Sequence, residues 1–325
     1  MDPAPLVDIH NLFLYYSSRS GPVQAVDDLS LPIFPGRAVG VLGESGCGKS
    51  SIPKAILRLL PSNVARYEGR IWMDGLDIMG LGEEQFRRQV RWVKISLVAQ
   101  AAMNALNPVA RIGRQVEEAL LAHGLTSKRQ AGERIRQVFA HVDLPEDVIQ
   151  RYPFQLSGGM RQRAVIAMAL VAEPRLVILD EPTSALDLLT QANIMNVLKR
   201  IKRDRKTSFM FITHDVGTCS ELADTVAVMY AGQLVELAEA ASFFRHPLHP
   251  YSHKLMASVP RLYGDQELEP IPGRPPSLID PPAGCRFRTR CDQSFSRCTQ
   301  TPPLLTTREG GRARCWLYET EAVQT

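Results

Sequence analysis

One glycine-rich segment limits most strictly what this chain can fold into. Residues 43–50 read GESGCGKS and fit the pattern G-x-x-x-x-G-K-[ST]. The apolar run AVGVL at residues 38–42 precedes the segment and predicts a short buried strand, and apolar residues at helical spacing follow over residues 51–60. A strand, a glycine loop and a helix in this order are the context that a phosphate-binding loop requires. We therefore expect a P-loop at residues 43–50 in an α/β core.

Each residue type in this loop has a chemical task. The glycines let backbone N–H groups turn toward phosphate oxygens, and the helix that follows adds unpaired N–H groups and the positive end of its dipole. We expect Lys49 to lie against the β- and γ-phosphates and the Ser50 hydroxyl to bind Mg²⁺. The loop residues predicted to contact a nucleotide are Gly43, Ser45, Gly46, Cys47, Gly48, Lys49, Ser50 and Ser51.

Composition sets broad limits on the class of protein. The chain has 325 residues, of which 45% are hydrophobic, so it can hold one large or two modest domains. A formal net charge of +4 does not call for a nucleic-acid partner. No apolar run approaches the roughly 18 residues of a membrane-spanning helix, and the initial residues MDPAP do not resemble a signal peptide. We expect a cytosolic chain that meets a membrane only through a partner.

Short strands are also expected before the P-loop. Residues 6–9, 12–16 and 23–33 predict strands around a turn, and Tyr15 and Tyr16 end one of them. An aromatic ring there can stack on an adenine, since any base offers a π face. Tyr16 is the candidate, while Tyr15 and simple packing within the sheet remain open.

Two acidic residues follow another buried strand. The run LVIL at residues 176–179 delivers Asp180 and Glu181 at its carboxyl end, which is the edge where open α/β sheets bind ligands. Gln100 and His214 each follow an apolar strand in the same way. Between these strands, residues 101–165 keep helical spacing and predict a helical insertion.

The composition changes after about residue 240, where prolines become frequent. Four of the six cysteines, Cys285, Cys291, Cys298 and Cys315, crowd into this part with the spacing C-x5-C-x6-C-x16-C. In a cytosolic chain such a group suggests a metal before it suggests disulfides. Four thiolates suit an iron–sulfur cluster and also zinc, and ligand type alone does not choose between them.

The motifs together are far more specific than any one of them. They stand in the order P-loop at 43–50, Gln100, LSGGMRQR at 156–163, LVILDEPT at 176–183, SALD at 184–187 and His214. This order resembles that of the ATP-binding subunit of an ABC transporter, over about residues 6–240. The resemblance implies an α/β P-loop NTPase core with an antiparallel β subdomain and a helical subdomain. We expect residues 1–240 to form the nucleotide-binding domain, with the helical subdomain at about 101–165, and residues 241–325 to form an irregular, cysteine-rich extension.

The resemblance also implies a role for each motif. Asp180 would hold Mg²⁺, and Glu181 would act as general base on the attacking water. Gln100 would contact Mg²⁺ and the water, and His214 would contact the γ-phosphate. Ser157, Gly158, Gly159 and Asp187 would complete an ATP site on a second ATPase subunit, so that ATP lies between two subunits.

The C-terminal part of the chain narrows the resemblance to one group of ABC transporters. Its segments HPYS at 249–252, SVP at 258–260, IPG at 271–273, PSL at 276–278 and GCRF at 284–287 are similar to the C-terminal extension of oligopeptide/dipeptide import ATPases, a group that also includes nickel and oligosaccharide importers. Members with this cysteine spacing are thought to hold a [4Fe–4S] cluster, which we favour over zinc here. We expect a structural role for this cluster, because no nucleotide-binding motif lies in the tail.

The implied partners are those of a membrane importer. They are a second ATPase subunit, expected to be a paralogue, two transmembrane permeases and, through them, an extracytoplasmic binding protein, with no nucleic acid. The chain would lie at the cytoplasmic face of the membrane as a peripheral subunit. The alternative is a soluble ABC-type ATPase of translation or DNA repair, but the chain carries a single cassette and no sustained heptads.

Overall fold

The computed structural model describes residues 4–184, 186–258, 270–308 and 310–321. Ala185 of the SALD segment and residues 259–260 of the SVP segment lie outside the described residues. The chain divides into two compact units. The helical unit comprises Met1–Leu6, Ile33–Ala38 and Gly75–Ile212, and the P-loop unit comprises Val7–Pro32, Val39–Asp74 and Thr213–Thr325.

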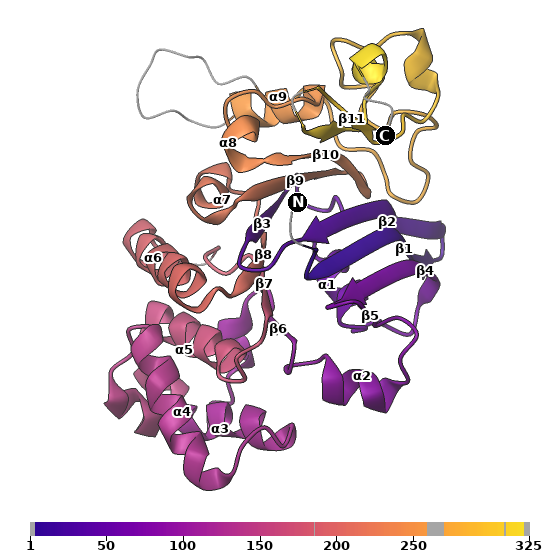
Figure 1. Ribbon diagram of the computed structural model, residues 1–325. Coiled ribbons are helices and arrows are strands. Elements are labelled where there is room, and N and C mark those ends of the chain that lie inside the picture. Colours follow the sequence, from indigo (N-terminus) through magenta and orange to yellow (C-terminus); the bar gives the residue numbers. More distant parts are fainter. Residues whose placement is uncertain (1–3, 185, 259–269, 309, 322–325) are drawn as a thin grey trace. The chain divides into compact units, whose positions relative to one another are not determined.

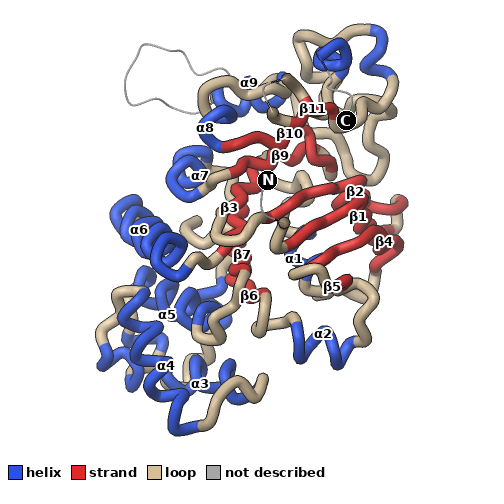
Figure 2. Tube along the Cα trace, in the orientation of Figure 1, coloured by secondary structure: helices blue, strands red, loops and turns tan. Residues whose placement is uncertain are grey.

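The P-loop unit contains an antiparallel group of long strands. β1 (Val7–Ser18) lies between β2 (Gly21–Ile33) and β4 (Val64–Met73), as Figure 2 shows. The two short strands expected at 6–9 and 12–16 are one strand, and its register shifts near Asn11. Asn11 has a φ of 45° and its side-chain amide donates to Asp28 Oδ1 on β2, so a kinked residue interrupts the alternation without ending the strand.

A second group of strands carries the P-loop. β3 (Ala38–Leu42), buried along its whole length, runs parallel to β9 (Thr225–Tyr230). β10 (Gln233–Glu239) returns antiparallel to β9. β12 (Arg312–Ala313) then pairs with β10, and β11 (Leu305–Thr306) pairs with β12. The C-terminal extension therefore adds two short strands that the sequence did not predict.

Helices of the P-loop unit are short. They are α1 (Ser51–Ile56), α7 (Val216–Leu222), α8 (Ala240–Phe243), α9 (Pro250–Ala257) and the 3₁₀ turns η4 (Ser296–Thr299) and η5 (Trp316–Glu321). α1 ends before the expected residue 60, because Arg58 adopts a left-handed backbone with φ 52° and the Tyr67 hydroxyl donates to the Ala55 carbonyl in the last turn.

The extension shares its core with the rest of the P-loop unit. Tyr251 and Phe287 are fully buried and pack around Tyr230 of β9, with ring centroids 4.6 and 5.2 Å from that of Tyr230. Phe243 of α8 belongs to the same apolar cluster. These aromatic contacts join the proline-rich segment to the core around β9.

The helical unit has a small parallel sheet. β6 (Ile95–Val98), β7 (Leu176–Asp180) and β8 (Ser208–Ile212) pair in that order, with Ile95 opposite Leu176 and Leu176 opposite Ser208. All residues of β7 and β8 are buried, as expected for parallel strands covered on both faces. The unit also holds β5 (Leu76–Asp77), α2 (Glu83–Gln89) and α6 (Leu188–Arg205).

The helical insertion has the character that its spacing predicts. It contains η1 (Ala102–Ala105), α3 (Ile112–Ala122), α4 (Lys128–His141), η2 (Glu146–Gln150), η3 (Pro153–Gln155) and α5 (Gly158–Leu170), drawn in magenta and rose in Figure 1. No strand lies between Val98 and Leu176, a stretch that is described throughout. Among the helices in the described parts of the chain, none is long and apolar enough to cross a membrane.

Candidate functional site

The P-loop unit places the predicted loop between β3 and α1. Lys49 is 95% buried, and its Nζ donates to the carbonyls of Gly43 (2.6 Å) and Glu44 (2.9 Å). Its ammonium group is therefore folded into the loop, where a triphosphate could take the place of these carbonyls as its partner. Ser50 stands at the N-cap of α1.

Glycine is required by close packing in this loop. A Cβ at Gly48 would lie 1.9 Å from the Ala25 carbonyl oxygen, and the φ of Gly48 is 108°. The N–H of Gly232, in the turn between β9 and β10, donates to the Cys47 carbonyl at 2.8 Å. The loop is thus pressed against two neighbouring segments, which hold its backbone in the shape that exposes N–H groups to an anion.

Tyr16 and Tyr15 have different surroundings. The Tyr16 hydroxyl lies 3.3 Å from Ser51 Oγ, at the start of α1, so this ring lies beside the P-loop. Tyr15 instead donates to Asp27, and burial raises the pKa of Tyr15 to about 12. This arrangement favours Tyr16 as the aromatic residue near a bound base.

His214 is exposed and follows Thr213, whose N–H donates to Val41 O on β3 at 3.2 Å.

The helical unit brings the two acidic residues and the glutamine together. Asp180 is the last residue of β7 and is 7% exposed. Gln100 Nε2 donates to Glu181 Oε2 at 3.0 Å. Glu181 has a φ of 49°, a left-handed conformation that non-glycine residues seldom adopt and that is found preferentially at functional sites. Carboxylate and amide oxygens are among the ligands that Mg²⁺ prefers, so Asp180 and Gln100 carry suitable donors within this unit.

The LSGG segment and the SALD segment meet within the helical unit. Ser157 is the N-cap of α5 and accepts from Met160 N at 3.3 Å, and Asp187 is the N-cap of α6 and accepts from Thr190 N at 2.9 Å. A Cβ at Gly159 would lie 2.6 Å from Thr190 Cγ2, so only glycine lets the start of α5 approach α6 this closely. Ser157 and Asp187 are both exposed, as residues that contact a second subunit must be.

The four tail cysteines line one small enclosed cavity, together with aromatic residues such as Phe295 and Trp316. All six cysteines are free, and Cys47 and Cys219 lie elsewhere, in the P-loop and in the core. Burial raises the pKa of Cys315 to about 11 and also raises the pKa values of the Cys285 and Cys291 thiols. The donor type alone suits a thiolate-held group, whose binding would displace the thiol protons.

Within the described residues, no group of three or more His, Cys, Asp or Glu side chains is arranged to hold a metal ion. The four thiols therefore share the lining of one cavity without forming a metal-binding group in this structure.

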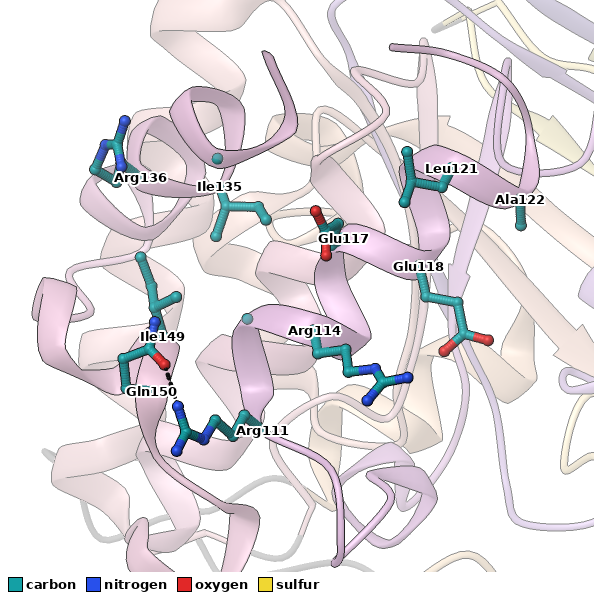
Figure 3. A pocket seen from close by; sticks show the side chains of 12 residues that line it. Arg111, Arg114, Glu117, Glu118, Leu121, Ala122, Ile135, Arg136, Ile149 and Gln150 are labelled. Carbon is teal, nitrogen blue, oxygen red and sulfur yellow. Dashed lines mark hydrogen bonds between the residues drawn. The ribbon is translucent and has the colours of Figure 1, made fainter. Parts of the chain in front are cut away.

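A larger open groove lies within the helical unit, away from every predicted site residue. It has a volume of about 1060 Å³ and is lined by side chains of α3, α4 and η2, including Arg114, Glu117 and Ile135 (Figure 3). Arg111 at one end donates to Gln150 Oε1 at 2.6 Å. Its lining is mixed in charge and lacks the glycine-rich backbone that phosphate binding needs, so we do not assign it to the nucleotide.

One set of contacts to the P-loop was not predicted. Arg290 and Tyr251 of the extension both bind Glu44, the second residue of the loop. The sequence does contain a signal, because each tail cysteine has an arginine next to it: Arg286, Arg290, Arg297 and Arg314. Spacing alone could not show that three of these arginines form ion pairs with β2 or with the P-loop.

Comparison with known proteins places these features in a family. An ABC transporter family model matches residues 26–184, and a model of the oligopeptide/dipeptide transporter C-terminal region matches residues 235–298. A dipeptide transport ATP-binding protein, DppD, from Caldanaerobacter subterraneus subsp. tengcongensis is 40% identical over 97% of this chain and 97% of its own length. The chain belongs to the ABC transporter family. Members of this family bind and hydrolyse ATP, so the chain is an ABC ATPase.

Further relatives agree with this assignment. An oligopeptide transport ATP-binding protein, OppD, from Haemophilus influenzae is 40% identical over 96% of this chain and 97% of that protein. Among solved structures, a dimeric ATP-binding cassette bound to ADP and Pi in a post-hydrolysis state has a TM-score of 0.64 and 27% identity, covering 72% of this ABC ATPase and 98% of that chain. The mixed α/β fold of the ABC ATPases is therefore confirmed.

Proposed function

We propose that the chain is the ATP-hydrolysing subunit of a membrane importer for dipeptides or oligopeptides. The observation that carries the proposal is the pairing of two matches on one chain, the ABC cassette at 26–184 and the oligopeptide/dipeptide C-terminal region at 235–298. Import of nickel or oligosaccharides is the alternative that the same extension leaves open. A soluble ATPase of translation or repair would not need this extension.

In the proposed mechanism, charge neutralisation and positioning do most of the chemical work, as in other phosphoryl transfers to water. Lys49 and the loop amides bind the phosphates, and Ser50 and Asp180 bind Mg²⁺. Glu181 takes the proton of the attacking water. The Gln100 amide donates to Glu181 and so holds this carboxylate. The Gln100 side-chain oxygen would contact Mg²⁺ and the attacking water.

His214 is proposed to contact the γ-phosphate, and Tyr16 to stack on the adenine. Ser157, Gly158, Gly159 and Asp187 act on the ATP bound by a second ATPase subunit. Support for the last assignment comes from the exposure of Ser157 and Asp187 and from the dimeric state of the related cassette. We propose a paralogue as this second subunit.

The other partners follow from the importer assignment. Two permease subunits would bind the helical unit, and an extracytoplasmic binding protein would deliver the cargo to them. The ATPase would then be a peripheral protein at the cytoplasmic face of the membrane. Its nucleotide chemistry requires no nucleic acid.

Cys285, Cys291, Cys298 and Cys315 are proposed to hold a [4Fe–4S] cluster, with zinc as the alternative. When bound, such a group supplies a cross-link between four points of the extension. The four free thiols around one cavity support this proposal.

The importer proposal can be tested by uptake measurements in cells that lack this gene and carry either the natural chain or a Lys49→Ala variant. We expect uptake of a labelled tripeptide to require the natural chain, because Lys49 is needed to bind ATP. Uptake of radioactive nickel and of a labelled trisaccharide serves as the comparison. If the Lys49→Ala cells lose nickel or trisaccharide uptake but take up the peptide normally, the cargo is nickel or an oligosaccharide and not a peptide. If these cells take up all three normally, the result favours a soluble ABC-type ATPase.

A further inference from the structure

Glu44 of the P-loop is held from outside the loop at both its backbone and its side chain. Its N–H donates to the Tyr251 hydroxyl at 2.9 Å, and its carboxylate accepts two bonds from Arg290, at 2.7 and 3.0 Å. Its carbonyl accepts from Lys49 Nζ at 2.9 Å. The residue that touches the catalytic lysine is thus fixed by two residues of the C-terminal extension, about two hundred positions further along the chain.

Arg290 is built to hold this position. Its side chain is 4% exposed, and its guanidinium also donates to the Pro272 carbonyl at 2.7 Å and to the Tyr230 hydroxyl at 3.2 Å. The same group lies against the rings of Tyr230 and Phe287. A two-pronged bond between guanidinium and carboxylate fixes direction as well as distance, so Arg290 orients Glu44 and does not merely attract it.

Tyr251 is held just as firmly. The buried carboxylate of Glu236 on β10 accepts the backbone N–H groups of Leu248 and His249, both at 2.8 Å. The His249 ring then accepts the Tyr251 N–H at 3.0 Å and caps α9. Burial lowers the pKa of His249 to about 3, which keeps the ring neutral and able to accept this bond. These contacts aim the fully buried Tyr251 side chain at the P-loop.

The charge of Glu44 explains why such support is needed. A carboxylate in the loop that binds a triphosphate repels the ligand unless a cation neutralises it. The Arg290 guanidinium is that cation, and the low exposure of the pair strengthens their interaction. Without Arg290, the carboxylate would be both free to move and uncompensated beside the phosphates.

Arg290 is also covalently next to Cys291, and the pattern repeats. Arg286 follows Cys285 and pairs with Asp27, and Arg314 precedes Cys315 and pairs with Asp28. Arg297 precedes Cys298 but pairs with Glu319, inside the extension itself. Three of the four arginines therefore connect the cysteine segment to β2 or to the P-loop, and the fourth does not.

We propose that Arg290 and Tyr251 are positioning residues for ATP binding, which set the P-loop through Glu44 and make nucleotide affinity depend on an ordered cysteine segment. The proposal rests on the proposed function only in taking the loop as the ATP site. It assigns to the extension a direct effect on the ATP site, in addition to any contact with a partner protein.

The test is the affinity of the purified full chain for ATP with Mg²⁺, measured by calorimetry for Arg290→Ala and for Arg297→Ala. Arg290→Ala should weaken binding about tenfold, the size expected for the loss of a charge-assisted hydrogen bond. Arg297→Ala should bind as the natural chain does, because it removes an ion pair of the same segment that does not reach the loop. Equal affinities for Arg290→Ala and the natural chain would overturn the proposal.

Two further variants separate positioning from general loss of structure. In a Glu44→Ala background, Arg290→Ala should have a much smaller effect, because the carboxylate that it exposes is gone; an undiminished effect would show that Arg290 acts elsewhere. Tyr251→Phe removes one hydroxyl and no packing volume, so it should weaken ATP binding at an unchanged melting temperature. If Tyr251→Phe binds ATP normally, the hydrogen bond from the Glu44 N–H to the Tyr251 hydroxyl does not contribute to ATP binding, and that part of the proposal is wrong.

Lys49→Ala distinguishes failure of this inference from failure of the proposed function. If Lys49→Ala binds ATP as tightly as the natural chain, the loop is not the ATP site and the proposed function fails. If Lys49→Ala loses binding while the Arg290 and Tyr251 variants retain it, only the inference fails.

Discussion

Glu181 differs from its neighbours in backbone as well as in chemistry. It follows a fully buried strand, turns into the left-handed region and accepts a hydrogen bond from Gln100. A strained backbone persists only where the surroundings hold it in place. This conformation directs the carboxylate away from the course that β7 would otherwise take.

Glu181→Gln should abolish ATP turnover and leave ATP binding intact, since only the proton-accepting oxygen is lost while size and hydrogen bonding are kept. The measurement is phosphate release by the assembled transporter, alongside ATP affinity of the isolated chain. Because the proposed second ATPase subunit would still act, the comparison is made with its equivalent glutamate also changed. Turnover near the natural rate in that double variant would remove Glu181 from the role of base.

Residues of the motifs could be predicted because each motif lies within a few consecutive positions. Lys49 and Ser50 were assigned from eight residues of sequence, and Gln100 and Glu181 from the strands that precede them. Glu44 could not be assigned in this way, since its partner Arg290 is 246 positions away and both are common residue types. Long-range side-chain pairs leave no periodic signal in one sequence.

At the scale of elements, long apolar runs were predicted well and short elements poorly. β7 follows the continuous apolar run LVIL at residues 176–179, and α3, α4 and α5 form where residues 101–165 keep helical spacing. β11 and β12 have two residues each, which is too short for any alternation to be visible. Their pairing with β10 depends on where the tail is anchored and not on local propensity.

The start of α5 gives a prediction at this scale. Ser157→Arg removes the N-cap, at a cost of about 1 kcal/mol, and fills the space at the exposed end of the helix. ATP binding by the isolated chain should remain unchanged, and ATP hydrolysis by the assembled pair of ATPase subunits should fall. Calorimetry on the chain and phosphate release from the complex measure the two effects. A sharp loss of ATP affinity in the isolated chain would contradict a role toward the second subunit.

At the scale of the whole molecule, the sequence predicted a nucleotide-binding domain up to residue 240 followed by an extension. Contacts group residues 213–325 with the P-loop, β1 and β2 in one compact unit. Buried ion pairs such as Arg286–Asp27 join the extension to β2. The domain boundary at residue 240 stays a prediction.

Cys291→Ser tests the cysteine segment as a whole. The natural chain, purified without oxygen, should be brown and contain about four irons, as a four-thiolate cluster requires. The variant should lose iron, become sensitive to proteolysis in the tail and, because Arg290 is its neighbour, bind ATP more weakly. Stoichiometric zinc in colourless natural protein would establish zinc as the bound metal. Unchanged ATP affinity in an iron-free variant would show that the cluster does not affect ATP binding by the P-loop.

The return of the tail to β10 also has a consequence for synthesis. The compact unit that contains the P-loop uses residues from Val7 to beyond Arg314, and β12 and Arg314 are among its last parts to be made. Domains fold as units while the ribosome adds about 5–20 residues each second. A nascent chain will therefore carry a complete GESGCGKS segment for many seconds before Tyr251 and Arg290 can brace it. Full affinity for ATP should therefore arise only after the segment that contains Arg290 has been synthesised.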